Sequence, residues 1–189
     1  MKKNVVIFIP GTESSEDGSK LSHLFIKLAN NIYSFIVNGP DNNTAWKNFL
    51  GKFGIVEVFK WDGRPSLKSV KYSLEALEEQ IDRFPEKTLI IVAESLGSEI
   101  VLSCENLWKV RKLILFCPVN KKRIINDLPV LEVYSRKDNF AVLGKRYFWP
   151  FKHSLTLRGN NVISVDVSPL RHKDFTPSLI GKYISDFLI

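Results

Sequence analysis

The sequence has 189 residues, of which 44% are hydrophobic and 25% are charged, and its formal net charge is +7. This composition is typical of a globular domain and excludes a low-complexity or disordered chain. No apolar run approaches the roughly 20 residues that a helix needs to cross a bilayer, which excludes a bundle of membrane-spanning helices. We therefore expect a single domain over residues 1–189.

The positive charge is concentrated in residues 109–158, which contain twelve Lys or Arg residues and three acidic residues. A basic surface can attract an anionic partner, a lipid surface or nucleic acid. It can equally be an ordinary solvated face. No recognisable nucleic-acid-binding motif accompanies these charges, so we expect no specific nucleic-acid partner, while an anionic partner or a lipid surface stays open.

The chain begins with the apolar run NVVIFIP at 4–10, which predicts a buried strand. This run is shorter than the apolar region of a secretory signal peptide and no small-residue cleavage site follows it, so we expect a cytoplasmic protein. Apolar residues then recur at helical spacing over 19–36. A turn cluster at 38–43 precedes a short predicted helix at 44–50.

The middle of the chain alternates between apolar runs typical of buried strands and apolar residues at helical spacing. A second strand is predicted at 54–61, and an amphipathic helix at 66–84 that Ser66 can cap and Pro85 stops. A third strand at 87–93 runs directly into a predicted helix at 96–105.

Three more strands are predicted in the second half of the chain, at 111–119, 129–135 and 161–167. The chain closes with a helix for which Thr176 is the expected N-cap and Pro177 the first residue. Its expected apolar stripe consists of Leu179, Ile180, Tyr183, Ile184, Phe187 and Leu188. Apolar strands that alternate with helices predict an α/β fold with a mainly parallel sheet of about six strands and helices on both faces.

The cysteines and histidines argue against a metal centre or a disulfide framework. The two cysteines, Cys104 and Cys117, lie in apolar runs, where buried free thiols are common. The three histidines are far apart in sequence, and none forms a cluster with zinc-site spacing. We expect no metal and no organic cofactor.

Candidate site residues follow from the sheet, because ligands of parallel α/β sheets bind at the carboxyl ends of the strands. Polar or glycine-containing segments follow five of the six predicted strands at this end. In chain order they are Pro10-Gly11-Thr12, Asp62, Ser95, Asp138 and His172. A serine, an acid and a histidine thus occur in that order, each after a different strand.

Ala93-Glu94-Ser95-Leu96-Gly97, between a buried strand and a helix, resembles the nucleophile elbow of the α/β-hydrolase family, Gly-x-Ser-x-Gly. Ala93 departs from the commonest form. The order of Ser95, Asp138 and His172 also matches that family, and the resemblance extends over nearly the whole chain. It implies the α/β-hydrolase fold, without a large cap domain because the connection between 111–119 and 129–135 is short.

The resemblance further implies a serine carboxylesterase or lipase-like enzyme that acts on small-molecule esters or thioesters. Ser95 would be the nucleophile, His172 the base and Asp138 the acid that orients the base. The backbone amides of Leu96 and Thr12 would form the oxyanion hole, with Gly11 allowing close backbone approach.

Each residue also has a structural interpretation. Ser95 could be the N-cap of the helix that follows it. Asp138 could be an ordinary turn residue, with Asp62 as the runner-up acid, and His172 could be a solvated loop residue. The aromatic and basic segment 140–159 could pack on the core or form a wall that binds acyl chains.

Two alternatives remain for the whole protein. One is a non-catalytic protein of the α/β-hydrolase fold that binds a ligand or partner. The other is a nucleic-acid- or membrane-binding module that uses the basic region 109–158.

Overall fold

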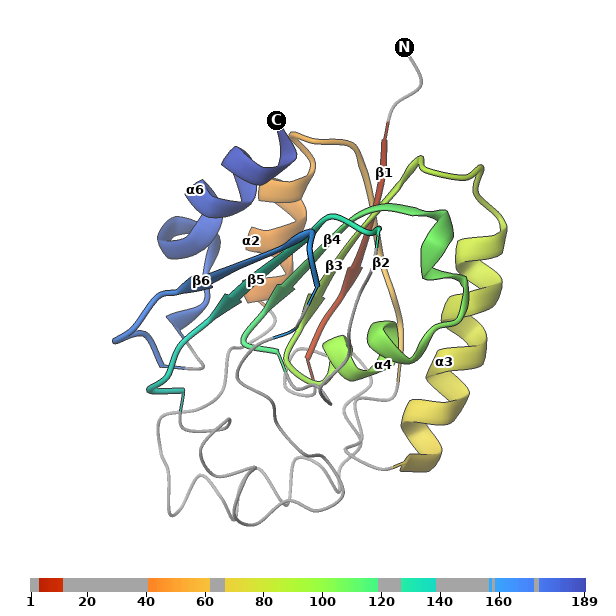
Figure 1. The fold of residues 1–189 in the computed structure, drawn as a ribbon, viewed down its shortest axis with the longest axis horizontal. Helices are drawn as coiled ribbons and strands as arrows, with labels where there is room; N and C mark the ends of the chain where they lie inside the picture. Colours follow the sequence, from red (N-terminus) through yellow and green to blue (C-terminus); the bar gives the residue numbers. More distant parts are fainter. Residues whose placement is uncertain are drawn as a thin grey trace.

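The computed structural model describes residues 4–11, 41–61, 67–118, 127–138, 157, 159–171 and 174–189. They form a six-stranded sheet in the order β2-β1-β3-β4-β5-β6 (Figure 1). All five strand pairs are parallel. The prediction of a mainly parallel sheet of about six strands is therefore confirmed.

The strands coincide with the apolar runs of the sequence. They are β1 (Val5–Ile9), β2 (Ile55–Val58), β3 (Leu89–Glu94), β4 (Val110–Phe116), β5 (Val130–Tyr134) and β6 (Val162–Asp166). Every residue of β3 is buried, because β3 lies between two strands and under helices on both faces. Strand β6 lies at one edge of the sheet and is the most exposed, with no residue fully buried.

Helices cover both faces of the sheet, as predicted (Figure 1). α3 (Leu67–Asp82) and α4 (Gly97–Ser103) pack on one face, and α2 (Asp41–Leu50) and α6 (Pro177–Leu188) on the other. A short 3-10 helix, η1 (Asn106–Lys109), precedes β4. Alternate side chains of β1 enter the two cores: Ile7 faces α3 and α4, and Phe8 faces α2 and α6.

Some predicted helix boundaries were wrong. α2 begins at Asp41, inside the expected turn cluster, and α4 ends at Ser103 because the chain continues into η1. Thr176 is the N-cap residue of α6 and Pro177 its first residue, as predicted, but the Thr176 side chain makes no capping hydrogen bond. Its Oγ1 lies 2.9 Å from Ser178 Oγ instead. The helix predicted over 19–36 and the cap residue Ser66 lie outside the described residues.

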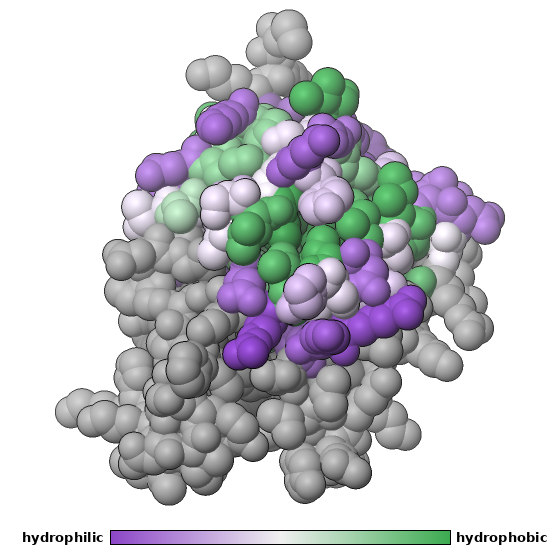
Figure 2. All heavy atoms as spheres, turned by 90° about the vertical axis from the view of Figure 1, so that its left-hand side faces the viewer, coloured by the Kyte–Doolittle hydropathy of each residue, from purple (hydrophilic) through white to green (hydrophobic). Residues whose placement is uncertain are grey.

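The predicted apolar stripe of α6 is only partly buried. Ile180 and Ile184 are fully buried, whereas Leu179 is 53% exposed and Tyr183 40% exposed. The helix packs on the sheet through a strip narrower than its apolar face, so the flanking side chains remain at the surface. Ile163 on the neighbouring edge strand is 55% exposed. Figure 2, which faces the β6 and α6 side of the molecule, shows the group of apolar side chains on this face.

Cys104 and Cys117 are both buried thiols, as predicted. In the part of the chain that the structure describes, none of the helices is long and apolar enough to cross a membrane.

Candidate active site

Ser95 lies on a sharp turn between a strand and a helix. β3 ends at Glu94 and α4 begins at Gly97, so the chain reverses its course within two residues. The φ angle of Ser95 is +48°, in the left-handed region that costs a residue with a Cβ about 1–2 kcal/mol. The Ser95 amide is held by the carbonyl oxygen of Phe116 on β4, 3.1 Å away. A strained serine between a buried strand and a helix is the local geometry of a nucleophile elbow.

The interpretation of Ser95 as a helix N-cap is wrong. The N-cap residue of α4 is Leu96, which makes no side-chain capping bond. The side-chain hydrogen bond in this turn comes from Ser98, whose Oγ donates to the Ser95 carbonyl oxygen over 2.5 Å. The Ser98 amide donates to the same oxygen over 3.0 Å. These bonds fix the backbone of Ser95 and do not use its side chain.

Two glycines allow the backbone to approach the turn closely. A Cβ added to Gly97 would lie 2.8 Å from the carbonyl oxygen of Ile9, and one added to Gly11 would lie 3.0 Å from the Cβ of Ser95. Both distances are too short for an unperturbed contact. The end of β1, the turn and the start of α4 therefore form one close-packed unit around Ser95.

The exit of β1 is fixed from the neighbouring strand. Trp61, which follows β2 and is buried, donates from Nε1 to the carbonyl oxygen of Pro10 over 2.9 Å. This bond positions the backbone beside Gly11, where the resemblance places the oxyanion hole. Leu96, whose amide is the first expected oxyanion donor, directly follows Ser95 in the turn. Thr12, the second expected donor, lies outside the described residues.

Asp138 follows β5 in a tight turn and is almost fully buried, with 2% of its surface exposed. Its amide donates to the carbonyl oxygen of Ser135 over 3.1 Å, which closes the turn. The Lys137 amide donates to Ser135 Oγ over 3.1 Å. All strands are parallel, so their carboxyl ends lie on the same side of the molecule. Asp138 and Ser95, which follow β5 and β3, therefore both lie at the carboxyl ends of the strands.

His172 and Asp62 lie outside the described residues. The structure thus brings Gly11, Ser95 and Leu96 together and places Asp138, like them, at the carboxyl ends of the strands. The assembly of the three proposed catalytic side chains stays a prediction.

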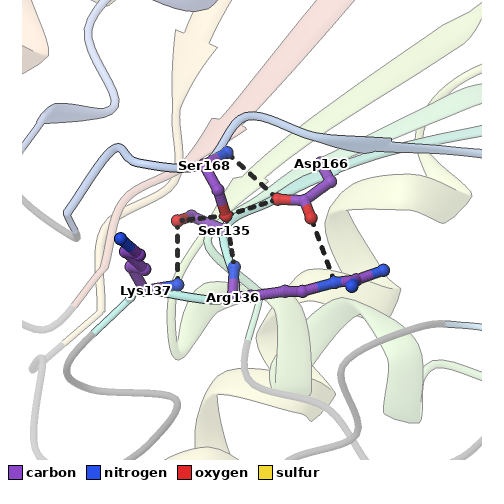
Figure 3. Close-up of polar contacts among 5 residues, drawn as sticks. All are labelled: Ser135, Arg136, Lys137, Asp166 and Ser168. Carbon is purple, nitrogen blue, oxygen red and sulfur yellow. Dashed lines mark hydrogen bonds and ion pairs between the residues drawn. The ribbon is translucent and has the colours of Figure 1, made fainter.

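Four residues that had not been predicted connect the turn after β5 with the turn after β6 (Figure 3). Ser168 Oγ donates to Asp166 Oδ1 over 2.7 Å and accepts from the Arg136 amide over 3.0 Å. It also lies 3.3 Å from Ser135 Oγ. Arg136 Nε forms an ion pair with Asp166 Oδ2 at 3.0 Å. The Ser168 hydroxyl and, to a lesser degree, Arg136 hold the pKa of Asp166 below its ordinary value of 3.8.

A buried carboxylate in the middle of β5 had also not been predicted. Glu132 is fully buried, and its Oε2 accepts hydrogen bonds from the Leu157 amide over 3.1 Å and from Ser164 Oγ over 2.8 Å. A charged residue inside an otherwise apolar strand is the sequence signal for such a site, because a buried carboxylate needs donors around it.

No group of three or more His, Cys, Asp or Glu side chains that could hold a metal ion occurs among the described residues. Most of the basic region 109–158 is outside them. Its two described ion pairs join Lys109 to Asp82 and Arg136 to Asp166. An anionic partner for this region stays a prediction.

Comparisons with known proteins agree on the fold. No protein-family model matches this sequence, and no curated protein matches it either. Among solved structures, α/β hydrolase domain-containing protein 10 from mouse is similar, with a TM-score of 0.60 and 15% identity over 98% of this chain and 89% of that one. A carboxylesterase from Mesorhizobium loti is similar with a TM-score of 0.54 and 12% identity, over 98% of this chain and 90% of that one.

SOBER1 from Arabidopsis thaliana matches over nearly the full length of both proteins, 99% of this chain and 98% of that one, with a TM-score of 0.54 and 11% identity. Such coverage means that the similarity extends well beyond the turn around Ser95. Together with the parallel sheet and its helices on both faces, the similarity to the α/β hydrolase domain-containing protein shows that the chain has the α/β-hydrolase fold.

Proposed function

We propose that this protein is a serine hydrolase that cleaves carboxylic esters or thioesters through Ser95, His172 and Asp138. The observation that carries the proposal is the backbone of Ser95, held at φ +48° between β3 and α4. A strained conformation persists only where the surroundings enforce it, and here Gly97, Gly11 and two hydrogen bonds from Ser98 do so. A serine that served only as a helix cap would not need this geometry.

The chemistry follows from the roles that these side chains can take. His172 would remove the proton of Ser95 Oγ as that oxygen attacks the acyl carbon. Asp138 would orient the imidazole and stabilise its protonated form. The tetrahedral intermediate would collapse with loss of the alcohol or thiol, which receives the proton from His172. Water, deprotonated by His172, would then release the acid and regenerate Ser95.

Backbone amides would stabilise the negative charge of the tetrahedral intermediate. Leu96 and Thr12 are the proposed donors, and the loss of one such donor costs about 3–4 kcal/mol of transition-state stabilisation in a comparable hydrolase. The close approach of Gly11 to Ser95 supports this placement, since a side chain at position 11 would push the β1 loop away from the nucleophile.

The test is covalent labelling of the folded protein with a fluorophosphonate, which reacts with an activated serine. We expect stoichiometric labelling at Ser95 and none in Ser95→Ala. Ser103→Ala is the matched control, because Ser103 lies on the same helix and its hydroxyl donates to the carbonyl oxygen of Glu99, away from the turn at Ser95. Folded wild-type protein that stays unlabelled, or equal labelling of Ser95→Ala, would overturn the proposal and favour a non-catalytic binding protein.

A further inference from the structure

The turn that contains Asp138 depends on a residue from another loop. Three consecutive amides in this turn, those of Arg136, Lys137 and Asp138, each have an acceptor. Two of these acceptors are the hydroxyl and carbonyl oxygens of Ser135, within the turn itself. The third is the hydroxyl of Ser168, which follows β6. The turn that contains Asp138 therefore needs a hydrogen-bond acceptor from another loop to satisfy all three amides.

The hydroxyl of Ser168 is fully used. A serine hydroxyl can donate one hydrogen bond and accept two. Its proton goes to Asp166 Oδ1, the shortest of its contacts at 2.7 Å and the one to a charged group. The Arg136 amide and the Ser135 hydroxyl therefore both donate to it, over 3.0 and 3.3 Å. One oxygen atom thus joins the turn after β5 to the end of β6.

Asp166 holds this hydroxyl in place. Its Oδ1 accepts from both the amide and the hydroxyl of Ser168, over 3.0 and 2.7 Å. Its Oδ2 pairs with the side chain of Arg136, which belongs to the turn after β5. Arg136 thus contacts the end of β6 and the turn after it twice, through its amide to Ser168 and through its side chain to Asp166 (Figure 3). We call Ser135, Arg136, Asp166 and Ser168 the loop clamp.

The loop clamp joins the two loops that matter for the proposed triad. The turn after β5 ends in Asp138, and the chain after Ser168 leads to His172. An acid and a base carried by separate loops must keep their relative position within a fraction of an ångström, and a displacement of about 1 Å can reduce the rate by about 100-fold. Ser168 and Asp166 themselves do not belong to the proposed triad.

We propose that Ser168 and Asp166 are positioning residues that hold the Asp138 turn against the loop leading to His172 and so set the reactivity of Ser95. This inference rests on the proposed function of Ser95. Loss of the clamp would leave Ser95 and its turn in place but misalign the acid with the base. The chemical step would slow, whereas substrate binding would not change.

The experiment compares Ser168→Ala and Asp166→Asn with wild type. We expect both to label with fluorophosphonate about tenfold more slowly, and kcat for p-nitrophenyl acetate to fall by a similar factor while KM changes less than about twofold. Ser168→Thr keeps the hydroxyl, and there is space for its methyl group because Ser168 is exposed. It should restore most of the rate. A purely structural role would instead lower Tm without slowing the folded enzyme.

Matched controls separate this effect from the loss of any surface hydrogen bond. Asp82→Asn removes a carboxylate that also has a cation and a side-chain donor, Lys109 and Asn106, but lies at the end of α3. Ser178→Ala removes an exposed hydroxyl of α6 that lies beside the hydroxyl of Thr176. Both should label at the wild-type rate.

The outcomes distinguish the inference from the function on which it rests. If wild type is not labelled, the proposed function fails and the inference fails with it. If wild type is labelled and Ser168→Ala reacts equally fast, only the inference is overturned. It is also overturned if Ser168→Thr is as slow as Ser168→Ala, or if hydrogen exchange of the Arg136 amide is not faster in Ser168→Ala.

Discussion

The α-carbon of Gly97 packs against the carbonyl group of Ile9, at the point where β1 ends beside the first turn of α4. A Cβ at this position would lie 2.8 Å from the Ile9 oxygen and 2.9 Å from its Cγ2. The oxygen belongs to a central strand of the sheet and has no freedom to move aside. Residue 97 can therefore be nothing larger than glycine while the turn keeps its shape.

Gly97→Ala should lower the free energy of unfolding by about 1–3 kcal/mol, because overpacking against backbone must be relieved by a backbone shift. The shift would move Ser95, so labelling by fluorophosphonate should also slow. Denaturant unfolding and labelling rates measure both effects.

Gly181→Ala provides the comparison for this glycine. A Cβ there would meet the ring of Phe49 at 2.9 Å, and a side chain can move where backbone cannot. The loss of stability should be smaller, and labelling of Ser95 should not change. Equal effects of the two substitutions would contradict the role assigned to Gly97.

Ser98→Ala removes the hydroxyl that bonds to the Ser95 carbonyl oxygen. Ser98 is fully buried, so we expect a loss of about 1 kcal/mol of stability, the usual net value of one hydrogen bond. The Ser98 amide still bonds to the same oxygen, so the turn should persist with a modest fall in labelling rate. Ser103→Ala, which removes a hydroxyl one turn of helix from Glu99, should leave the rate unchanged. A labelling rate for Ser98→Ala equal to that of wild type would show that the Ser98 hydroxyl is not needed to hold the Ser95 backbone.

Glu132→Ala should lower the free energy of unfolding by about 1–3 kcal/mol, because the buried amide of Leu157 loses its acceptor. Glu132→Gln keeps an acceptor oxygen at nearly the same volume, so its effect should be smaller. Urea unfolding of both variants tests this order. A Glu132→Ala protein as stable as wild type would mean that the amide finds another acceptor.

Stability should depend on pH through Asp166. The Ser168 hydroxyl and Arg136 hold its pKa below 3.8 in the folded protein, so the folded state favours the ionised form. Its contribution is therefore fully present above about pH 4, close to the pKa of an unfolded aspartate, and is lost as the pH falls through the lower folded value. The stability difference between wild type and Asp166→Asn should shrink from pH 5 to pH 2.5. A difference that is constant over this range would contradict the assignment.

Much of this fold could be predicted from the sequence because its central strands are buried on both faces. Such strands appear as continuous apolar runs, and the predicted runs at 4–10, 87–93 and 111–119 became β1, β3 and β4. The turn at Ser95 could also be predicted, because a tight strand-to-helix connection requires small residues at fixed positions. Gly97 is one of them, and its contact with Ile9 gives the reason.

The features that could not be predicted depend on tertiary contacts. Leu179 and Tyr183 have the same helical spacing as the buried Ile180 and Ile184 on α6. Which of these side chains is buried depends on the width of the surface that the sheet offers to the helix, and the sequence does not reveal this width. The loop clamp is a second example. Ser135 and Ser168 are 33 residues apart, and a hydrogen bond between two loops leaves no periodic pattern in a sequence.

The separation of these residues along the chain has a consequence for synthesis. Translation runs from the amino terminus, and early segments can begin to fold before late ones exist. A nascent chain therefore contains Ser95, and the β4 carbonyl group that holds its amide, well before it contains Ser168. Until then, no acceptor from the second loop can complete the turn that presents Asp138. The order of translation would thus keep Ser95 from its full reactivity on the ribosome until the loop after β6 has been made.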